Sequence, residues 1–167
     1  MTTTQFQGIQ ALIVDDLVDT RDLLGIILNL HGIATTCVTS VREALEVYQS
    51  LKPDIVISGI AMPEEDGLSL IRHIRALKPE EGGQVPAIAI TASSVEEIRL
   101  AALEAGFQAF LSQPVDIDEL IEVVAKVVKS HRQGAKHFHI EGRLEFPFNR
   151  LTCCQMKSGQ QSSLLLV

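Results

Sequence analysis

The sequence predicts an α/β domain in which a doubly wound, five-stranded parallel sheet is flanked by five helices. From residue 9 onward, short apolar runs alternate five times with longer amphipathic runs. The apolar runs are continuous, which is typical of strands covered by helices on both faces. Right-handed crossovers between successive strands then make the sheet parallel.

The strand and helix pairs follow one another in a regular order along the chain. The predicted strands cover residues 9–14, 33–38, 54–58, 87–91 and 109–111. The predicted helices cover residues 18–30, 40–51, 66–77, 95–105 and 116–129. Each helix is long enough to return the chain to the starting edge of the sheet, so the pattern is that of five βα units.

Helix boundaries are marked by capping and stop signals. Three pairs have the spacing of a capping box, in which a side chain at the helix start accepts a backbone hydrogen bond three residues later. These pairs are Ser40 with Glu43, Ser94 with Glu97, and Asp116 with Glu119. Helices are expected to end near Gly32, Pro53 and Gly106.

Composition indicates one globular domain with short appendages. The chain has 167 residues, of which 46% are hydrophobic and 21% charged. We expect an N-terminal tail over residues 1–8, the domain over 9–130 and a C-terminal tail over 131–167 that is mostly mobile. The C-terminal tail is too short for an output domain, although residues 140–148 have the pattern of a short strand or hairpin.

Charge and cysteine content point to a cytoplasmic protein that does not bind nucleic acid. The formal charge is −7, and residues 1–130 hold 19 acidic and 9 basic side chains, so the domain repels a phosphate backbone. No apolar run is long enough to span a membrane. The cysteines, Cys37 and the adjacent Cys153 and Cys154, do not form a disulfide framework and fit a reducing compartment.

The residues at the carboxyl ends of the strands form the candidate site, because doubly wound sheets bind ligands there. Asp15 and Asp16 follow the first strand, and Gly59 follows the third. The fourth strand ends in Thr91. The fifth contains Phe110 and leads into Gln113 and Pro114.

Several motifs in this order carry a family resemblance. They are the acidic pair at 15 and 16, the Met-Pro-x-x-Asp-Gly loop at 62–67, the Thr-Ala pair at 91 and 92, and the Gln-Pro pair at 113 and 114. Over about residues 8–130 the chain resembles the receiver domains of two-component response regulators, especially those attached to hybrid histidine kinases. The resemblance implies a flavodoxin-like sheet with strand order 2-1-3-4-5.

The resemblance also implies that the reactive groups of a receiver are missing. In that family a carboxylate at the position of Gly59 accepts the phosphoryl group, and a lysine at the position of Gln113 helps to neutralise its charge. Losing both groups leaves no uncompensated buried charge, so the domain can stay folded without its reaction. We therefore expect a degenerate receiver, a pseudo-receiver, although a backbone requirement for glycine at 59 is an alternative.

Other family residues are retained. The resemblance assigns Asp15 and Asp16 to a magnesium site, which we expect to be vestigial and weak without a third carboxylate. Alternatively, Asp16 helps to start the first helix. Thr91 and Phe110 match the residues that report phosphorylation in the family, and ordinary packing is the alternative role for Phe110.

These residues predict a signalling protein that is not an enzyme and requires no cofactor. We expect a phosphorylation-independent protein-interaction module of two-component phosphorelay signalling, whose partner is a histidine kinase or another response regulator. One alternative is a phosphorelay receiver with an unconventional acceptor, for which Ser58 and Asp66 are the candidates. Another is a sensor that binds a small ligand in the space left by Gly59.

Overall fold

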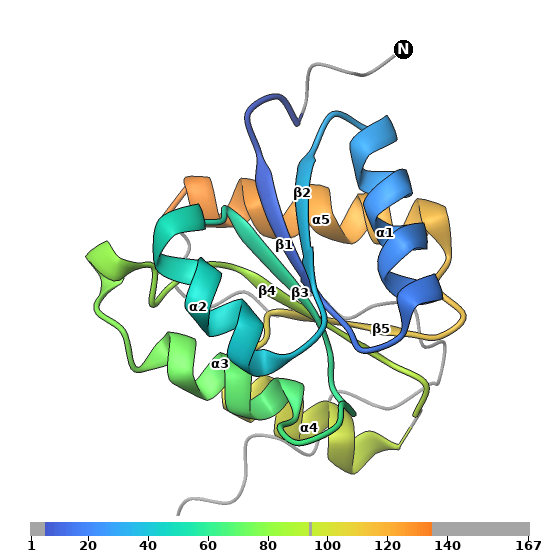
Figure 1. Ribbon diagram of the computed structural model, residues 1–167. Coiled ribbons are helices and arrows are strands. Elements are labelled where there is room, and N and C mark those ends of the chain that lie inside the picture. Colours follow the sequence, from blue (N-terminus) through green and yellow to red (C-terminus); the bar gives the residue numbers. More distant parts are fainter. Residues whose placement is uncertain (1–5, 94, 135–167) are drawn as a thin grey trace, which may run out of the picture.

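The computed structural model describes residues 6–93 and 95–134 and confirms the predicted architecture (Figure 1). One parallel sheet has the strand order β2-β1-β3-β4-β5. The strands are β1 (Gln10–Val14), β2 (Ala34–Val38), β3 (Ile55–Gly59), β4 (Ala87–Thr91) and β5 (Ala109–Ser112). The helices are α1 (Val18–Leu30), α2 (Val41–Leu51), α3 (Gly67–Arg75), the short 3₁₀ helix η1 (Pro79–Glu81), α4 (Glu96–Ala105) and α5 (Ile117–Arg132).

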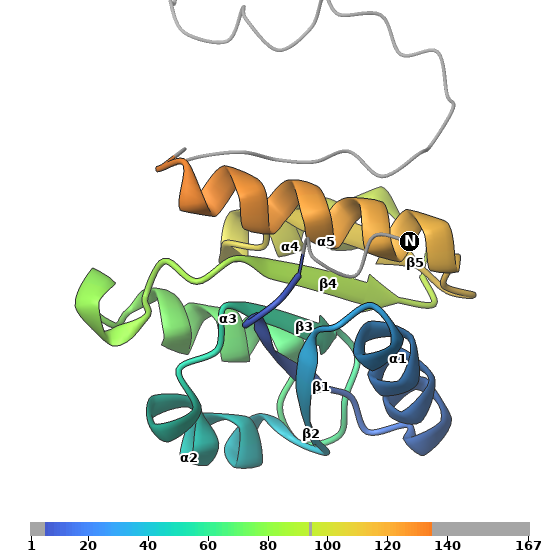
Figure 2. The same ribbon diagram turned by 90° about the horizontal axis from the view of Figure 1, so that it is seen from above.

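Helices cover both faces of the sheet, as Figure 2 shows from above. α1 and α5 pack on one face, around a core that includes Ile13, Ile57 and Ile90. α2, α3 and α4 pack on the other face, where Phe107 and the neighbouring core side chains are buried. Because both faces are covered, β1, β3 and β4 are buried along almost their whole length, whereas the edge strand β2 is buried only at Val38.

Side-chain caps start two helices as their spacing predicts. Ser40 Oγ accepts a hydrogen bond from the backbone N–H of Glu43 at 3.2 Å, and Asp116 Oδ1 accepts one from Glu119 at 2.9 Å. The prediction for α4 is wrong, because this helix begins after Val95, which has no side-chain oxygen to accept a bond. The predicted cap, Ser94, lies outside the described residues.

The described fold includes residues on both sides of the expected domain limits of 9 and 130. Phe6 is only 4% exposed and belongs to the core under α1 and α5. At the other end, α5 continues to Arg132, and the basic residues of its last turn interact favourably with the helix dipole. The short strand or hairpin predicted over residues 140–148 lies outside the described residues.

Tyr48 connects α2 to the turn that follows η1 through a hydrogen bond, and its burial makes stability depend on pH. Its hydroxyl donates to the carbonyl of Gly82 at 2.9 Å, and burial raises the pKa of Tyr48 to about 12. Unfolded tyrosine ionises near pH 10, so the native state holds its proton over a range in which the unfolded state loses it. The resulting stability is present in full below about pH 10 and is lost as the pH rises toward 12.

We expect Tyr48→Phe to lower the free energy of unfolding by about 1 kcal/mol at neutral pH and to remove the contribution of Tyr48 to its alkaline slope. Urea unfolding at several pH values measures both effects. The chain has one tyrosine, so alkaline titration of its absorbance also reports the native pKa without interference. An ionisation near pH 10 in the folded protein would contradict the buried hydroxyl.

Candidate functional site at the carboxyl edge of the sheet

The strand ends bring the predicted site residues to one edge of the sheet. Val14 pairs with Ser58, so Asp15 and Gly59 follow at the same level on neighbouring strands. Gly59 pairs with Ile90, and Thr91 pairs with Ser112 in the next strands along. The edge is therefore assembled as predicted, with Gly59 between the acidic pair and the threonine.

Gly59 has no conformational need to be glycine. It lies within β3 and is not among the described residues with a positive φ angle. A Cβ atom added to Gly59 would lie 2.9 Å from Asp15 Oδ2 and 3.6 Å from Met62 Cγ. The backbone alternative for this glycine is thus not supported, and the space that a side chain would need is taken up by the carboxylate of Asp15.

Asp15 is a buried carboxylate held by the start of α1. It is 4% exposed, and its Oδ1 accepts a hydrogen bond from the backbone N–H of Leu17 at 2.9 Å. Burial raises the pKa of Asp15, and the negative charge of Asp16 raises it further, while the Leu17 N–H and the charge of Arg21 act in the opposite direction. Asp15, rather than Asp16, makes the side-chain contact at the helix start.

Arg21 is the site residue that the sequence interpretation missed. Its Nη1 donates to the carbonyl oxygen of Asp15 at 2.8 Å and to that of Asp16 at 3.4 Å. A guanidinium group therefore holds the backbone of the acidic pair from the second turn of α1. The available signal was the spacing, because position 21 lies one helical turn beyond Leu17 and so faces the same strand end.

Thr91 and Phe110, which match the residues that report phosphorylation in the family, occupy different surroundings. Thr91 is 6% exposed, and its hydroxyl oxygen accepts the backbone N–H of Ser93 at 3.1 Å, so it is engaged by its own loop. Phe110 is half-buried and packs against the core on the α2, α3 and α4 side of the sheet. This packing agrees with the alternative role for Phe110.

Gln113 stands at the lysine position and continues the end of β5. Its backbone N–H donates to the carbonyl of Thr91 at 2.8 Å, and its peptide bond to Pro114 is cis. The backbone thus places residue 113 at the same edge as Asp15 and Gly59. The side chain there is a neutral amide instead of an ammonium group.

Both candidate substitute acceptors have structural roles, Ser58 near the end of β3 and Asp66 at the start of α3. Ser58 is fully buried, and its hydroxyl donates to the carbonyl of Gly59 at 2.9 Å. Asp66 caps α3 by accepting the N–H of Ser69 at 2.7 Å. The next residue, Gly67, has to be glycine, because a Cβ atom at that position would lie 2.1 Å from the Gly59 carbonyl oxygen.

The donor set fits magnesium poorly. Mg²⁺ in proteins takes carboxylate and water oxygens in an octahedral arrangement. Asp15 and Asp16 supply two carboxylates, one of which is already bonded to Leu17, and Gly59 supplies no side-chain oxygen. Within residues 6–93 and 95–134, no group of three or more His, Cys, Asp or Glu side chains could hold a metal ion.

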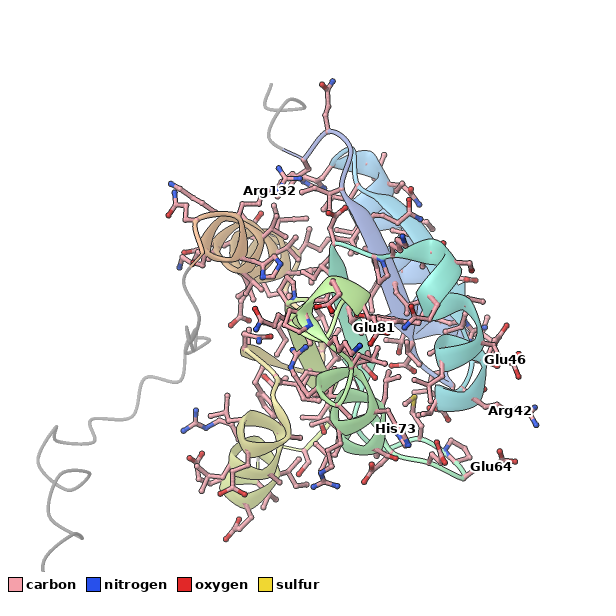
Figure 3. All side chains as sticks on the ribbon, turned by 90° about the vertical axis from the view of Figure 1, so that its left-hand side faces the viewer. Arg42, Glu46, Glu64, His73, Glu81 and Arg132 are labelled. Atoms are coloured by element: carbon pink, nitrogen blue, oxygen red, sulfur yellow. The ribbon has the colours of Figure 1, made fainter. Side chains whose placement is uncertain are left out.

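A cavity of about 690 Å³ lies between the start of α2 and the loop that precedes α3. Figure 3 labels four of its lining residues: Arg42 and Glu46 on α2, Glu64 in the loop and His73 on α3. Neither Gly59 nor any other residue of the candidate site lines it. The ring nitrogen Nδ1 of His73 lies 2.9 Å from the Ser69 carbonyl, as expected for a surface histidine on a helix.

Known proteins share this architecture. The chain is 45% identical over 113 residues to a 14.6 kDa protein from the sodA1 3′ region of Leptolyngbya boryana, covering 68% of this chain and 85% of that protein. It is 32% identical over 130 residues to the regulatory protein AtoC of Escherichia coli, covering 77% of this chain but only 27% of AtoC.

Solved structures agree with these relatives. The receiver domain of the Francisella response regulator 1452 has a TM-score of 0.67 at 27% identity, covering 74% of this chain and 99% of that domain. The receiver domain of the sensor histidine kinase PA1611 of Pseudomonas aeruginosa, which holds a magnesium ion in its active-site cleft, has a TM-score of 0.67 at 28% identity, covering 74% and 99%.

None of the described helices is long and apolar enough to cross a membrane.

The match to a family model covers most of the described fold. The model of the response regulator receiver domain matches residues 11–125, from the first strand to the middle of α5. The chain therefore belongs to the response regulator receiver domain family.

Proposed function

We propose that this chain is a pseudo-receiver, which keeps the receiver scaffold of two-component signalling but does not accept a phosphoryl group. It acts in the cytoplasm as a protein-interaction module, binds a histidine kinase or another response regulator, and turns over no substrate. By its motifs the chain resembles the receivers attached to hybrid histidine kinases.

The observation that carries this proposal is the pair Gly59 and Asp15. Phosphoryl transfer needs a nucleophile within bonding reach of phosphorus, and residue 59 has no side chain to supply one. Asp15 Oδ2 sits 2.9 Å from where a Cβ at residue 59 would lie, so the carboxylate fills the acceptor's place. Because it also accepts the Leu17 N–H, Asp15 has a structural role there.

Loss of the cation fits the same interpretation. An ammonium group at residue 113 would neutralise an acyl phosphate, but without the phosphate it would be an unneeded charge near the edge of the sheet. Gln113 avoids that cost while the backbone bond to Thr91 is kept. Magnesium binding, if retained, is weak and is not required for the proposed role.

Without phosphate, Thr91 keeps its bond to Ser93, and the surface formed by α4, β5 and α5 stays in one state unless a partner changes it. Three large apolar side chains of this surface are about half exposed, namely Val95 (49%), Leu100 (48%) and Ile117 (49%). We propose this surface as the partner-binding face. Exposed apolar side chains rimmed by acidic residues suit a protein partner.

The described residues offer no support for either alternative. An unconventional acceptor needs a free nucleophile beside a base, whereas the hydroxyl of Ser58 and the carboxylate of Asp66 are already bonded to backbone groups. A ligand sensor needs free space beside Gly59, whereas a Cβ atom added there would lie 2.9 Å from Asp15 Oδ2.

Affinity capture from the native cell tests the proposed function. The full chain is immobilised, and extracts are applied with and without a small-molecule phosphodonor and Mg²⁺. We expect the same histidine kinase or response regulator to bind in both conditions, and Leu100→Glu to reduce that binding. Capture that appears only when the phosphodonor is present would contradict the proposal.

A further inference from the structure

The cavity between α2 and α3 forms a groove that the proposed pseudo-receiver function does not use. Its volume of about 690 Å³ is within the range of about 300–1,000 Å³ that is typical of binding sites. The residues that line this α2–α3 groove are Ser40, Val41, Arg42, Leu45, Glu46, Pro63, Glu64, Glu65 and His73. None of them belongs to α4, β5 or α5, so the groove is separate from the partner-binding face proposed above.

The groove has an apolar base and a charged rim. Val41 is 2% exposed and belongs to the core on this side of the sheet, and the partly buried Leu45 packs against that core. The charged and titratable residues around them are exposed, namely Arg42, Glu46, Glu64, Glu65 and His73. Figure 3 shows the four of these that it labels on the same side of the molecule. Protein interfaces commonly combine an apolar centre with a polar rim in this way.

The charges of the rim are not paired with one another. Arg42 and Glu46 lie one turn apart on α2, a spacing at which opposite charges can form an ion pair. The ion pairs found within residues 6–93 and 95–134 are instead those of Arg99 with Glu96 and of Lys126 with Glu122, on α4 and α5. The rim of the groove therefore presents charges that a partner can still neutralise.

Glu64 holds a backbone conformation that glycine or asparagine adopts more easily. Its φ angle is 67°, in the left-handed region, where a side chain other than these is unfavourable. Such strain occurs most often where a residue serves binding or catalysis. A glutamate at this point of the rim is therefore costly for the fold, which supports a role for its carboxylate in binding.

The balance of charge identifies the occupant. Three carboxylates, those of Glu46, Glu64 and Glu65, face one guanidinium, that of Arg42, so the rim is acidic. We propose that the α2–α3 groove binds a segment of a protein partner in which basic side chains flank an apolar one. The apolar side chain covers the base of the groove, and the basic side chains reach the glutamates.

Other occupants carry the wrong charge. Residues 1–134 of this chain hold nineteen acidic and ten basic side chains, so a second copy would bring a surface of the same sign to the acidic rim. The phosphate backbone of a nucleic acid and an anionic membrane surface are negative as well. A basic segment of a protein is attracted, and its apolar side chain distinguishes this groove from other acidic surfaces.

Fluorescence anisotropy at low ionic strength tests the proposal with the full chain. The probe is a fluorescein-labelled peptide, Lys-Leu-Lys-Leu-Lys, with both ends blocked. We expect Glu64→Lys with Glu65→Lys to raise its dissociation constant at least about tenfold, because two attractions become repulsions. The matched control, Glu104→Lys with Asp118→Lys, changes two exposed acidic residues outside the groove and should alter the constant less than about twofold.

Two further changes separate docking in the groove from a loss of structure. Arg42→Glu should lower the dissociation constant about threefold, because it removes the one like charge of the rim. A peptide with serine in place of leucine should bind the unmodified chain about fivefold more weakly, because it leaves the apolar base uncovered.

The proposal would be overturned if the leucine peptide did not bind, or if the control variant weakened binding as much as Glu64→Lys with Glu65→Lys. Sedimentation of the chain alone tests the remaining occupant. Dimers that Glu64→Lys with Glu65→Lys abolishes would also overturn the proposal, because the groove would then be covered by a second copy.

Discussion

The double variant Gly59→Asp with Gln113→Lys is expected to gain one phosphoryl group when it is incubated with a small-molecule phosphodonor and Mg²⁺. The change restores the nucleophile and the cation at positions that the backbone still holds at the site edge. Asp15, Asp16 and Thr91 supply the remaining groups. The expected effect is the largest of those proposed, from no detectable uptake to stoichiometric uptake.

Asp15 has to move before the new aspartate fits. A Cβ at residue 59 would come within 2.9 Å of Asp15 Oδ2, which is the free end of a side chain and can turn away. The single variant Gly59→Asp should take up much less phosphate, because a third carboxylate joins the acidic pair without a cation. Magnesium affinity should rise in both variants.

Intact-protein mass measures the uptake, and Gly59→Asn with Gln113→Lys is the matched control. This control has nearly the same shape and the same cation but cannot form an acyl phosphate. If the aspartate variant stays unmodified while its circular dichroism spectrum and magnesium binding match those of a folded receiver, the rest of the pocket has also been lost.

Arg75→Leu is expected to lower the free energy of unfolding by about 3 kcal/mol. The guanidinium of Arg75 joins three segments on the far side of the sheet from α1. It donates to the Gly106 carbonyl at 2.8 and 3.1 Å, to the Gly83 carbonyl at 3.1 Å and to Gln108 Oε1 at 3.2 Å. Removing it leaves partly buried acceptors unpaired and leaves the end of α4 without its cation.

Urea unfolding measures this loss, with Arg72→Leu as the control. Arg72 lies on the same helix, one turn before Arg75, and is exposed. The control should change the free energy of unfolding by less than about 0.5 kcal/mol. Equal effects of the two substitutions would show that helix propensity, rather than the bonds of Arg75, accounts for the change.

The order and type of the elements were predictable because each leaves a strong local pattern. Continuous apolar runs marked the strands, and Ser40 and Asp116 marked the starts of α2 and α5 by their capping distance. The start of α4 was predicted wrongly, because the capping spacing at Ser94 is also found outside helices and Val95 takes the cap position. The local sequence pattern does not decide which of two neighbouring residues is the N-cap of a helix.

The sequence predicted which residues lie at the candidate site, but not which atoms of these residues contact one another. The motifs identified Asp15, Gly59, Thr91 and Gln113, and the sheet brings their positions to one edge. That Asp15 Oδ2 fills the space beside Gly59 depends on a rotamer, which the sequence does not encode. The hydrogen bond from Arg21 to the Asp15 carbonyl likewise depends on the direction in which α1 begins after β1, which the sequence does not encode.

The most direct test of the central claim is phosphotransfer from a histidine-phosphorylated donor domain, carrying radiolabel, to the full unmodified chain. A receiver domain that retains its acceptor aspartate runs in parallel and should become labelled with an alkali-labile acyl phosphate. We predict that no label passes to this chain at any magnesium concentration. Stoichiometric label on any of its residues would contradict the claim that the chain signals without accepting phosphate.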